Sequence, residues 1–173
     1  MKTSDSIFLR ALNKESLEIP PIWYMRQAGR YMPEYRAVRK KFKNFLDMCK
    51  NPEVCCELAL QPINAFNLDA SILFSDILTI PDAFGLGVEF LEGEGPVFKN
   101  PIKTPKDISS LPEFNSDDLS YVYEAVSNIK RALPKNIPLI GFCGSPWTLA
   151  AYSIEGRSSK EFNYTKDLSL IHI

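Results

Sequence analysis

Two short apolar runs, separated by segments with helical patterns, constrain the fold of this chain more than any other feature. Ala70–Phe74 is almost continuously apolar, has the length of a strand and turns polar at Ser75 and Asp76. Pro138–Cys143 is a second run of the same kind. Strands that are apolar on both faces are typical of parallel sheets covered by helices. The sequence therefore predicts repeating β/α units around a parallel sheet.

The segments around these runs carry helix-start and helix-stop signals. Residues 88–91 and 97–98 flank a Gly-rich turn and predict a hairpin. The expected helices are one capped by Ser4 or Asp5, one from Pro33 through Arg39, one opened by Asn51-Pro52 and kinked or shortened by Pro62, one from Ser116 to Leu133, and one capped by Ser145 that carries Tyr152 early in its length.

Composition excludes several classes of protein. The 173 residues contain 20 Lys+Arg and 21 Asp+Glu, so the net charge of −1 gives no basic field for nucleic acid. No apolar run approaches the roughly 18–20 residues that cross a bilayer, and no signal-peptide core is visible, so we expect a cytoplasmic protein. The four cysteines form no Cys-x-x-Cys pair and the one histidine is His172, so we expect reduced thiols and no metal site.

The segment 21–39 is the strongest indication of a binding site. It places four arginines, Arg26, Arg30, Arg36 and Arg39, among aromatic residues. Guanidinium groups are always charged and bind carboxylates through two parallel hydrogen bonds. The pattern predicts a site for a planar small molecule with several negative charges. The alternative is that these arginines pair with the chain's own acids at the surface.

Three neighbours of these arginines and two distant residues complete the candidate site. Gly29, preceded by Gln27 and Ala28, allows a positive φ or close approach of a ligand, and its peptide N–H groups are further donors. Asp76 and Tyr152 follow the two predicted strands, and functional residues of parallel β/α folds gather at the carboxyl ends of strands. We expect these groups to face one cleft. The alternatives are a helix N-cap for Asp76 and a core position for Tyr152.

Four blocks of sequence resemble the uroporphyrinogen decarboxylase family, in the family's order and across the chain to about Thr165. Each block alone is weak, but together they are specific. They are the segment 21–36 (Pro-Ile-Trp-Tyr-Met-Arg-Gln-Ala-Gly-Arg-Tyr-Met-Pro-Glu-Tyr-Arg), the segment 74–87 (Phe-Ser-Asp-Ile-Leu-Thr-Ile-Pro-Asp-Ala-Phe-Gly-Leu-Gly), Gly-Glu-Gly-Pro at 93–96, and the segment 141–156 that begins Gly-Phe-Cys-Gly-Ser-Pro-Trp.

The resemblance implies a (β/α)8 TIM barrel and a homodimer. It also implies cofactor-free decarboxylation of the four acetate side chains of uroporphyrinogen III to coproporphyrinogen III, a step of haem biosynthesis. Chains of the family are about twice as long, so the match supplies only the N-terminal part of the barrel. We expect residues 1–166 to be part of that single domain and residues 167–173 to be a cut or foreign tail. A fragment of this kind is expected to be inactive alone.

The resemblance also assigns roles to residues. Asp76 would accept hydrogen bonds from the pyrrole N–H groups and stabilise the cationic ring, and Tyr152 would hydrogen-bond near the reacting acetate. Arg26 would bind carboxylates and donate or shuttle a proton. Further substrate contacts would come from Gln27, Ala28, Gly29, Arg30 and, more weakly, Arg39. The family's serine or threonine and histidine come from its C-terminal half, and the surroundings of His172 do not match that histidine.

Two alternatives remain open at this point. One is a corrinoid-linked methyltransferase with the same barrel, which would need zinc held by histidine and cysteine. The other is a non-catalytic fragment that binds porphyrinogen or pairs with another chain through exposed strand edges.

Overall fold

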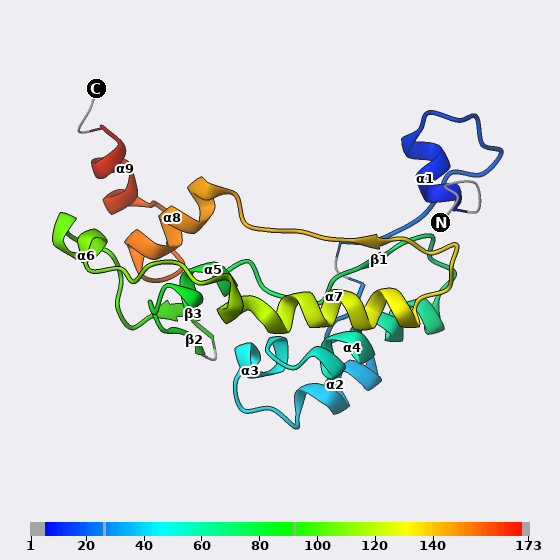
Figure 1. Ribbon diagram of the computed structural model, residues 1–173, viewed down its shortest axis with the longest axis horizontal. Coiled ribbons are helices and arrows are strands. Elements are labelled where there is room, and N and C mark those ends of the chain that lie inside the picture. The colour runs from blue at the N-terminus through cyan, green and yellow to red at the C-terminus, as the bar shows by residue number, and fades with distance from the viewer. Residues whose placement is uncertain (1–5, 26, 92, 171–173) are drawn as a thin grey trace. The chain divides into compact units, whose positions relative to one another are not determined.

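The computed structural model describes residues 6–25, 27–91 and 93–170, and the chain forms two compact units. The first unit comprises Met1–Ser75 and Tyr121–Phe142, and the second comprises Asp76–Ser120 and Cys143–Ile173. Figure 1 labels the elements of both units. The boundary at Ser75 falls where the first predicted strand ends.

The first unit contains the predicted parallel pair. Strand β1 (Ser71–Ile72) pairs in parallel with β4 (Leu139–Ile140), with Ser71 opposite Leu139. Both strands are shorter than the apolar runs that predicted them. Only Ser71 with Leu139 and Ile72 with Ile140 form ladder pairs between the two segments. Hydrogen bonds from Ser71 N to Pro138 O and from Leu73 N to Ile140 O, each 2.9 Å, hold the pair together.

The helices that begin at Pro33 and Pro52 start where the sequence predicted them, whereas the helix predicted from Ser116 begins there as a 3-10 turn and becomes α-helical at Ser120. The helices of the first unit are α1 (Ile7–Leu12), α2 (Pro33–Arg39), α3 (Phe45–Cys49), α4 (Pro52–Ala65) and α7 (Ser120–Ala132). The predicted cap of α1 is corrected: Ser6 accepts from Leu9 N, whereas Ser4 and Asp5 lie outside the described residues. Helix α4 continues one turn beyond Pro62, so the prediction that this proline shortens it is wrong. A proline lacks only its own N–H, and the Phe66 N–H still bonds to the Pro62 carbonyl at 2.9 Å.

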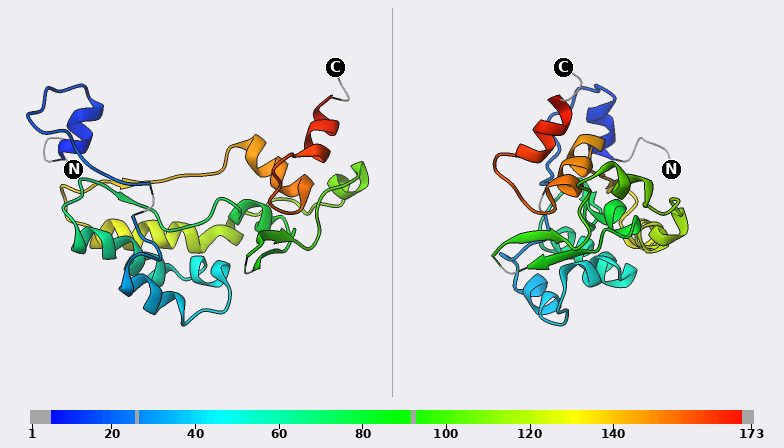
Figure 2. Two further views of the ribbon diagram at one scale, coloured as in Figure 1. Left: turned by 180° about the vertical axis from the view of Figure 1, so that it is seen from behind. Right: turned by 90° about the vertical axis from the view of Figure 1, so that its left-hand side faces the viewer.

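Two connected clusters form the core of this unit. In the first cluster, α4 and α7 pack against Leu73, through Cys55, Ala59, Ala125, Ile129 and Leu133. Both views of Figure 2 show α4 and α7 side by side. The second cluster joins α2, α3 and α4 through Tyr35, Val38, Met48 and Leu58. Phe74 contacts both clusters, so the residue just before the unit boundary packs against both parts of the core.

The second unit is built from short helices and the predicted hairpin. Strands β2 (Val88–Leu91) and β3 (Gly95–Phe98) are antiparallel, which confirms the hairpin. The other elements are α5 (Thr79–Ala83), α6 (Pro105–Ser109), a 3-10 turn (Ser116–Leu119), α8 (Pro146–Glu155) and α9 (Asn163–Leu170). Ser145 caps α8 as predicted, accepting from Thr148 N at 3.2 Å.

The carboxyl end of α8 is held to the segment that follows the hairpin. Gly156 ends the helix with a φ of 79°, and its carbonyl accepts from Phe98 N at 2.8 Å. The Ile102 N–H donates to Ser153 O at 2.9 Å, and the Lys103 ammonium donates to the Glu155 carbonyl at 3.2 Å. A lysine at this end also interacts favourably with the helix dipole.

Replacing Gly156 with alanine should destabilise the chain for two reasons. The left-handed conformation costs a non-glycine residue about 1–2 kcal/mol. An added Cβ would also lie 2.8 Å from Pro101 Cβ, an overlap that typically costs about 1–3 kcal/mol more. Gly85→Ala is the matched control, because Gly85 has a φ of 74° but open space around the added Cβ. We expect urea unfolding to show a larger loss for Gly156→Ala, and equal losses would contradict the predicted overlap.

Candidate active site

The arginine-rich segment is attached to the sheet through Gln27. Its side chain is 2% exposed, and its Nε2 donates to the Ala70 carbonyl at 2.7 Å. Its Oε1 accepts from the Ile72 N–H at 3.1 Å. Gln27 was predicted to bind substrate, and the structure shows that its amide is bonded on both sides to the main chain of β1.

The turn after Gln27 differs from the conformation expected at Gly29. Gly29 lies outside the left-handed region, and its carbonyl accepts from Met32 N at 3.0 Å. An added Cβ would meet the Tyr31 ring at 3.4 Å, which is an ordinary contact. Of the two roles predicted for Gly29, the positive φ is therefore not used, and close approach of a ligand stays a prediction. Ala28 packs against the second core cluster.

The arginines of this segment do not pair with the chain's own acids within the described part. Arg30 is exposed, and among the described residues its guanidinium has no carboxylate or hydrogen-bond partner. The Arg36 guanidinium donates to the Arg30 carbonyl at 2.8 Å, and the Arg39 guanidinium donates to the Phe42 carbonyl at 2.5 Å. Arg26 lies outside the described residues. The alternative of surface ion pairs is therefore not supported for the three described arginines.

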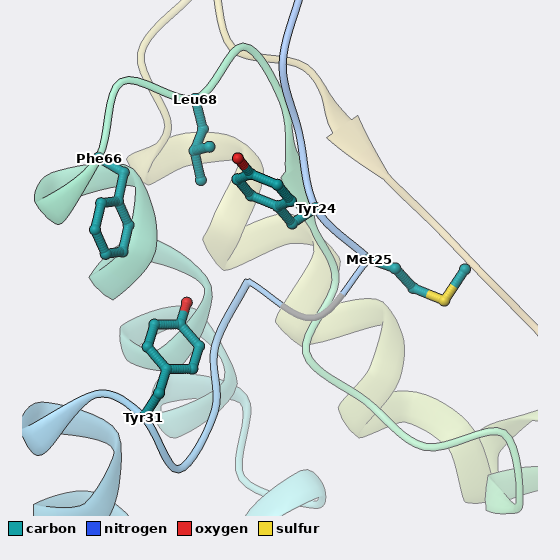
Figure 3. A pocket seen from close by; sticks show the side chains of 5 residues that line it. All are labelled: Tyr24, Met25, Tyr31, Phe66 and Leu68. Carbon is teal, nitrogen blue, oxygen red and sulfur yellow. The ribbon is translucent and has the colours of Figure 1, made fainter.

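A pocket of about 570 Å³ opens beside this loop. Figure 3 shows the Tyr31 and Phe66 rings facing each other, with Leu68 and Tyr24 close together nearby and Met25 pointing away. The centroids of the Tyr31 and Phe66 rings are 6.5 Å apart. All five lining residues belong to the first unit, and the side chains of Tyr24, Met25, Tyr31 and Phe66 are largely exposed. The loop therefore combines an exposed cation with an apolar surface.

Asp76 is the half-buried carboxylate at the end of the segment that follows β1. Burial raises the pKa of Asp76 above its ordinary value of 3.8, and the Leu78 N–H partly lowers that pKa. This N–H donates to Oδ1 of Asp76 at 2.8 Å. The N-cap of α5 is Leu78 itself, so the alternative that Asp76 caps the following helix is wrong. The carboxylate instead forms a local turn with the residue two positions on.

Tyr152 lies in the second half of α8, which corrects the expectation of an early position. It is half-buried, and its carbonyl accepts from Gly156 N at 2.9 Å. Helices α5 and α8 are in contact, and a Cβ at Gly144 would lie 3.3 Å from Ile77 Cβ. The residue after Asp76 thus packs against the turn that leads into the helix bearing Tyr152.

The candidate residues divide between the two units. Residues 27–30 and Arg39 lie in the first unit, and Asp76 and Tyr152 lie in the second. Their convergence on one cleft stays a prediction. Sequence reasoning missed the anchoring role of the Gln27 side chain, because a glutamine in a polar segment carries no signal that it will be buried.

The cysteines and acids of the described residues do not form a group of three or more that could hold a metal ion. Burial raises the pKa of the Cys55 thiol to about 12, whereas Cys143 is exposed. His172 lies outside the described residues.

No helix in the described part of the chain is long and apolar enough to cross a membrane.

Comparisons with known proteins agree with the sequence blocks. Three curated relatives, each named uroporphyrinogen decarboxylase, are 58% identical to this chain. They come from Francisella philomiragia (91% of this chain, 46% of the relative), Acinetobacter baumannii (93% and 45%) and Dichelobacter nodosus (95% and 48%). The chain spans about half the length of the curated relatives that it matches, as the resemblance predicted.

A solved structure shares the fold at a greater evolutionary distance. A methyltransferase from Methanosarcina mazei superposes with a TM-score of 0.68 at 19% identity, over 95% of this chain and 48% of that one. This likeness concerns the fold alone. The model of the family described as uroporphyrinogen decarboxylase (URO-D) matches residues 3–171. The sequence blocks, the relatives and this match together show that the chain belongs to the uroporphyrinogen decarboxylase family.

Proposed function

We propose that this chain supplies the N-terminal part of a (β/α)8 barrel that decarboxylates uroporphyrinogen III to coproporphyrinogen III. The observation that carries the proposal is Arg30. It is an exposed guanidinium without an acidic partner in the described residues, on a loop whose neighbouring side chains are apolar. Such a group is suited to the carboxylates of an incoming ligand. The 58% identity to three named decarboxylases supports the choice of substrate.

The carboxylates of the substrate explain the number of arginines. Uroporphyrinogen carries eight carboxylates around a macrocycle, and the segment 21–39 carries four guanidinium groups. We assign Arg26 and Arg30 to carboxylate binding, with main-chain donors from Ala28 and Gly29. The described guanidinium of Arg39 bonds to Phe42 O, so we assign it a weaker contact.

The proposed chemistry requires a single anion near the ring centre. Asp76 would accept hydrogen bonds from the pyrrole N–H groups. A proton, with Arg26 as its donor, would add to the α carbon of the pyrrole, next to the carbon that bears the acetate, and give a cationic ring, which Asp76 stabilises. The bond to the carboxylate would then break, carbon dioxide would leave, and its electron pair would neutralise the ring. Protonation of the exocyclic methylene would give the methyl group, and loss of the proton first added to the ring would restore the neutral pyrrole. Tyr152 would position the acetate.

This mechanism needs no cofactor, because the protonated pyrrole itself receives the electron pair. The methyltransferase alternative rests on a likeness at 19% identity, which carries no evidence about activity. The named relatives at 58% identity favour decarboxylation. The expected homodimer and cytoplasmic location stay predictions.

Removing the Asp76 carboxylate should abolish most of the activity without unfolding the protein. The test enzyme is a joined chain: residues 1–165 of this protein followed by the part of the Acinetobacter baumannii relative beyond the match. We expect Asp76→Ala to lower the rate of carbon dioxide release from uroporphyrinogen by about 10²–10³-fold, because it removes a preorganised charge that faces the transition state.

The control is Asp107→Ala. This half-buried acid of the second unit forms the capping box of α6 and has no assigned catalytic role. The control should keep near-normal activity, and near-normal activity of Asp76→Ala would remove that residue from the mechanism. We expect the 173-residue chain alone to release no carbon dioxide, because the family's serine or threonine and histidine come from the other half.

The ionised carboxylate of Asp76 should also lower the free energy of unfolding at neutral pH. Its pKa is raised in the folded state, so the folded state binds more protons than the unfolded state between pH 3.8 and that raised pKa, and stability falls as the pH rises through this window. Asp76→Asn keeps an oxygen for the Leu78 N–H but carries no charge. In urea unfolding we expect the variant to be more stable than the original at neutral pH. The difference should vanish toward pH 3.8. A pH-independent difference would contradict the raised pKa.

A further inference from the structure

We propose that Gln27 is a positioning residue whose side-chain amide binds the Ala70 carbonyl and the Ile72 N–H and thereby sets the position of the arginine loop. This inference rests on the proposed function. It differs from the substrate contact that the sequence predicted for Gln27, because the amide binds the protein's own main chain.

The two edges of β1 have different partners. On one edge, the N–H groups of Ser71 and Leu73 donate to the main chain of the β4 segment. Main-chain groups of successive strand residues point to opposite edges. The Ala70 carbonyl and the Ile72 N–H therefore face the other edge, and there they meet Gln27.

The segment before Gln27 is held to Asp69, which precedes the residues that Gln27 binds. The Ile22 N–H donates to Oδ2 of Asp69 at 2.7 Å, and the Asp69 N–H donates to the Ile22 carbonyl at 2.8 Å. Figure 3 shows the chain bearing Tyr24 beside the segment that follows Leu68. Main-chain and carboxylate bonds hold the start of this segment, and the Gln27 amide holds its end.

Only an amide side chain can replace a peptide group both as a hydrogen-bond donor and as a hydrogen-bond acceptor. It offers N–H donors and a carbonyl acceptor in one plane, and here one N–H and the oxygen are used as in a peptide bond. At 2% exposure, no water can take over these bonds if the amide is lost. Gln27 is also tied to the turn, because the Tyr31 hydroxyl donates to the Gln27 carbonyl. The amide thus fixes a segment in which Arg26 precedes Gln27 directly and Arg30 follows three residues later.

The test compares Gln27→Met with Ser71→Ala in the joined chain. Methionine keeps the length and the apolar stem of glutamine and removes both hydrogen bonds. Ser71→Ala is matched in burial: it removes a buried bond from Ser71 Oγ to Ala59 O at 3.3 Å on the same strand, away from the loop. We expect Gln27→Met to raise KM for uroporphyrinogen and to lower kcat/KM at least about tenfold, since a displacement of about 1 Å can cost about 10²-fold. Ser71→Ala should leave KM unchanged.

Hydrogen exchange gives a readout that does not need activity. In Gln27→Met the Ile72 amide should exchange at least about tenfold faster, because its acceptor is gone, while the Leu73 amide, bonded to β4, stays protected. If Gln27→Met does not fold, Gln27→Asn is measured in the same way, because its amide is too short to keep both bonds.

The outcomes separate the inference from the proposed function. A joined chain with Gln27 intact that releases no carbon dioxide would overturn the function, while the exchange of Ile72 would still decide whether the amide anchors the loop. An active joined chain with an unchanged KM in the Gln27 variants would overturn the positioning role. So would an unchanged exchange rate at Ile72.

Discussion

The hydrogen bonds on the two edges of β1 are the constraint on which the first unit depends. A buried strand must satisfy its main-chain groups on both sides, and an unpaired buried group costs about 1–3 kcal/mol. The β4 segment bonds to one edge, and the Gln27 amide bonds to the other. The bonds that satisfy these main-chain groups therefore also hold the arginine loop, so stability and the site share one set of contacts.

The charges of the candidate site are held in two different ways. Arg30 is exposed and has no acidic partner in the described part of the chain, so its charge stays hydrated and available to a ligand. Asp76 is half-buried, and the Leu78 N–H only partly offsets the cost of its charge. A carboxylate that costs the fold stability is consistent with a functional role, because such groups persist where function requires them.

Local sequence signals predicted much of the secondary structure. Caps at Asn51 and Ser145 and the hairpin at 88–98 were confirmed, because each depends on side chains within a few residues of the main-chain groups they satisfy. Errors arose where distant packing decides. Tyr152 lies in the second half of α8 and not early in it, and Asp76 forms a local turn and not the N-cap of α5.

The sequence by itself determined the parallel pairing of two apolar strands, the clustering of arginines and the family, because these depend on residue order and composition. Only the tertiary structure decided that the Gln27 amide binds β1, that the described arginines lack acidic partners and that burial raises the pKa of Asp76. The Gln27 bonds join groups 43 and 45 residues apart in the chain, and the burial of Asp76 depends on how the surrounding elements pack. An apolar run of strand length indicates a buried strand, but nothing in the residues around Gln27 or Asp76 indicates these contacts.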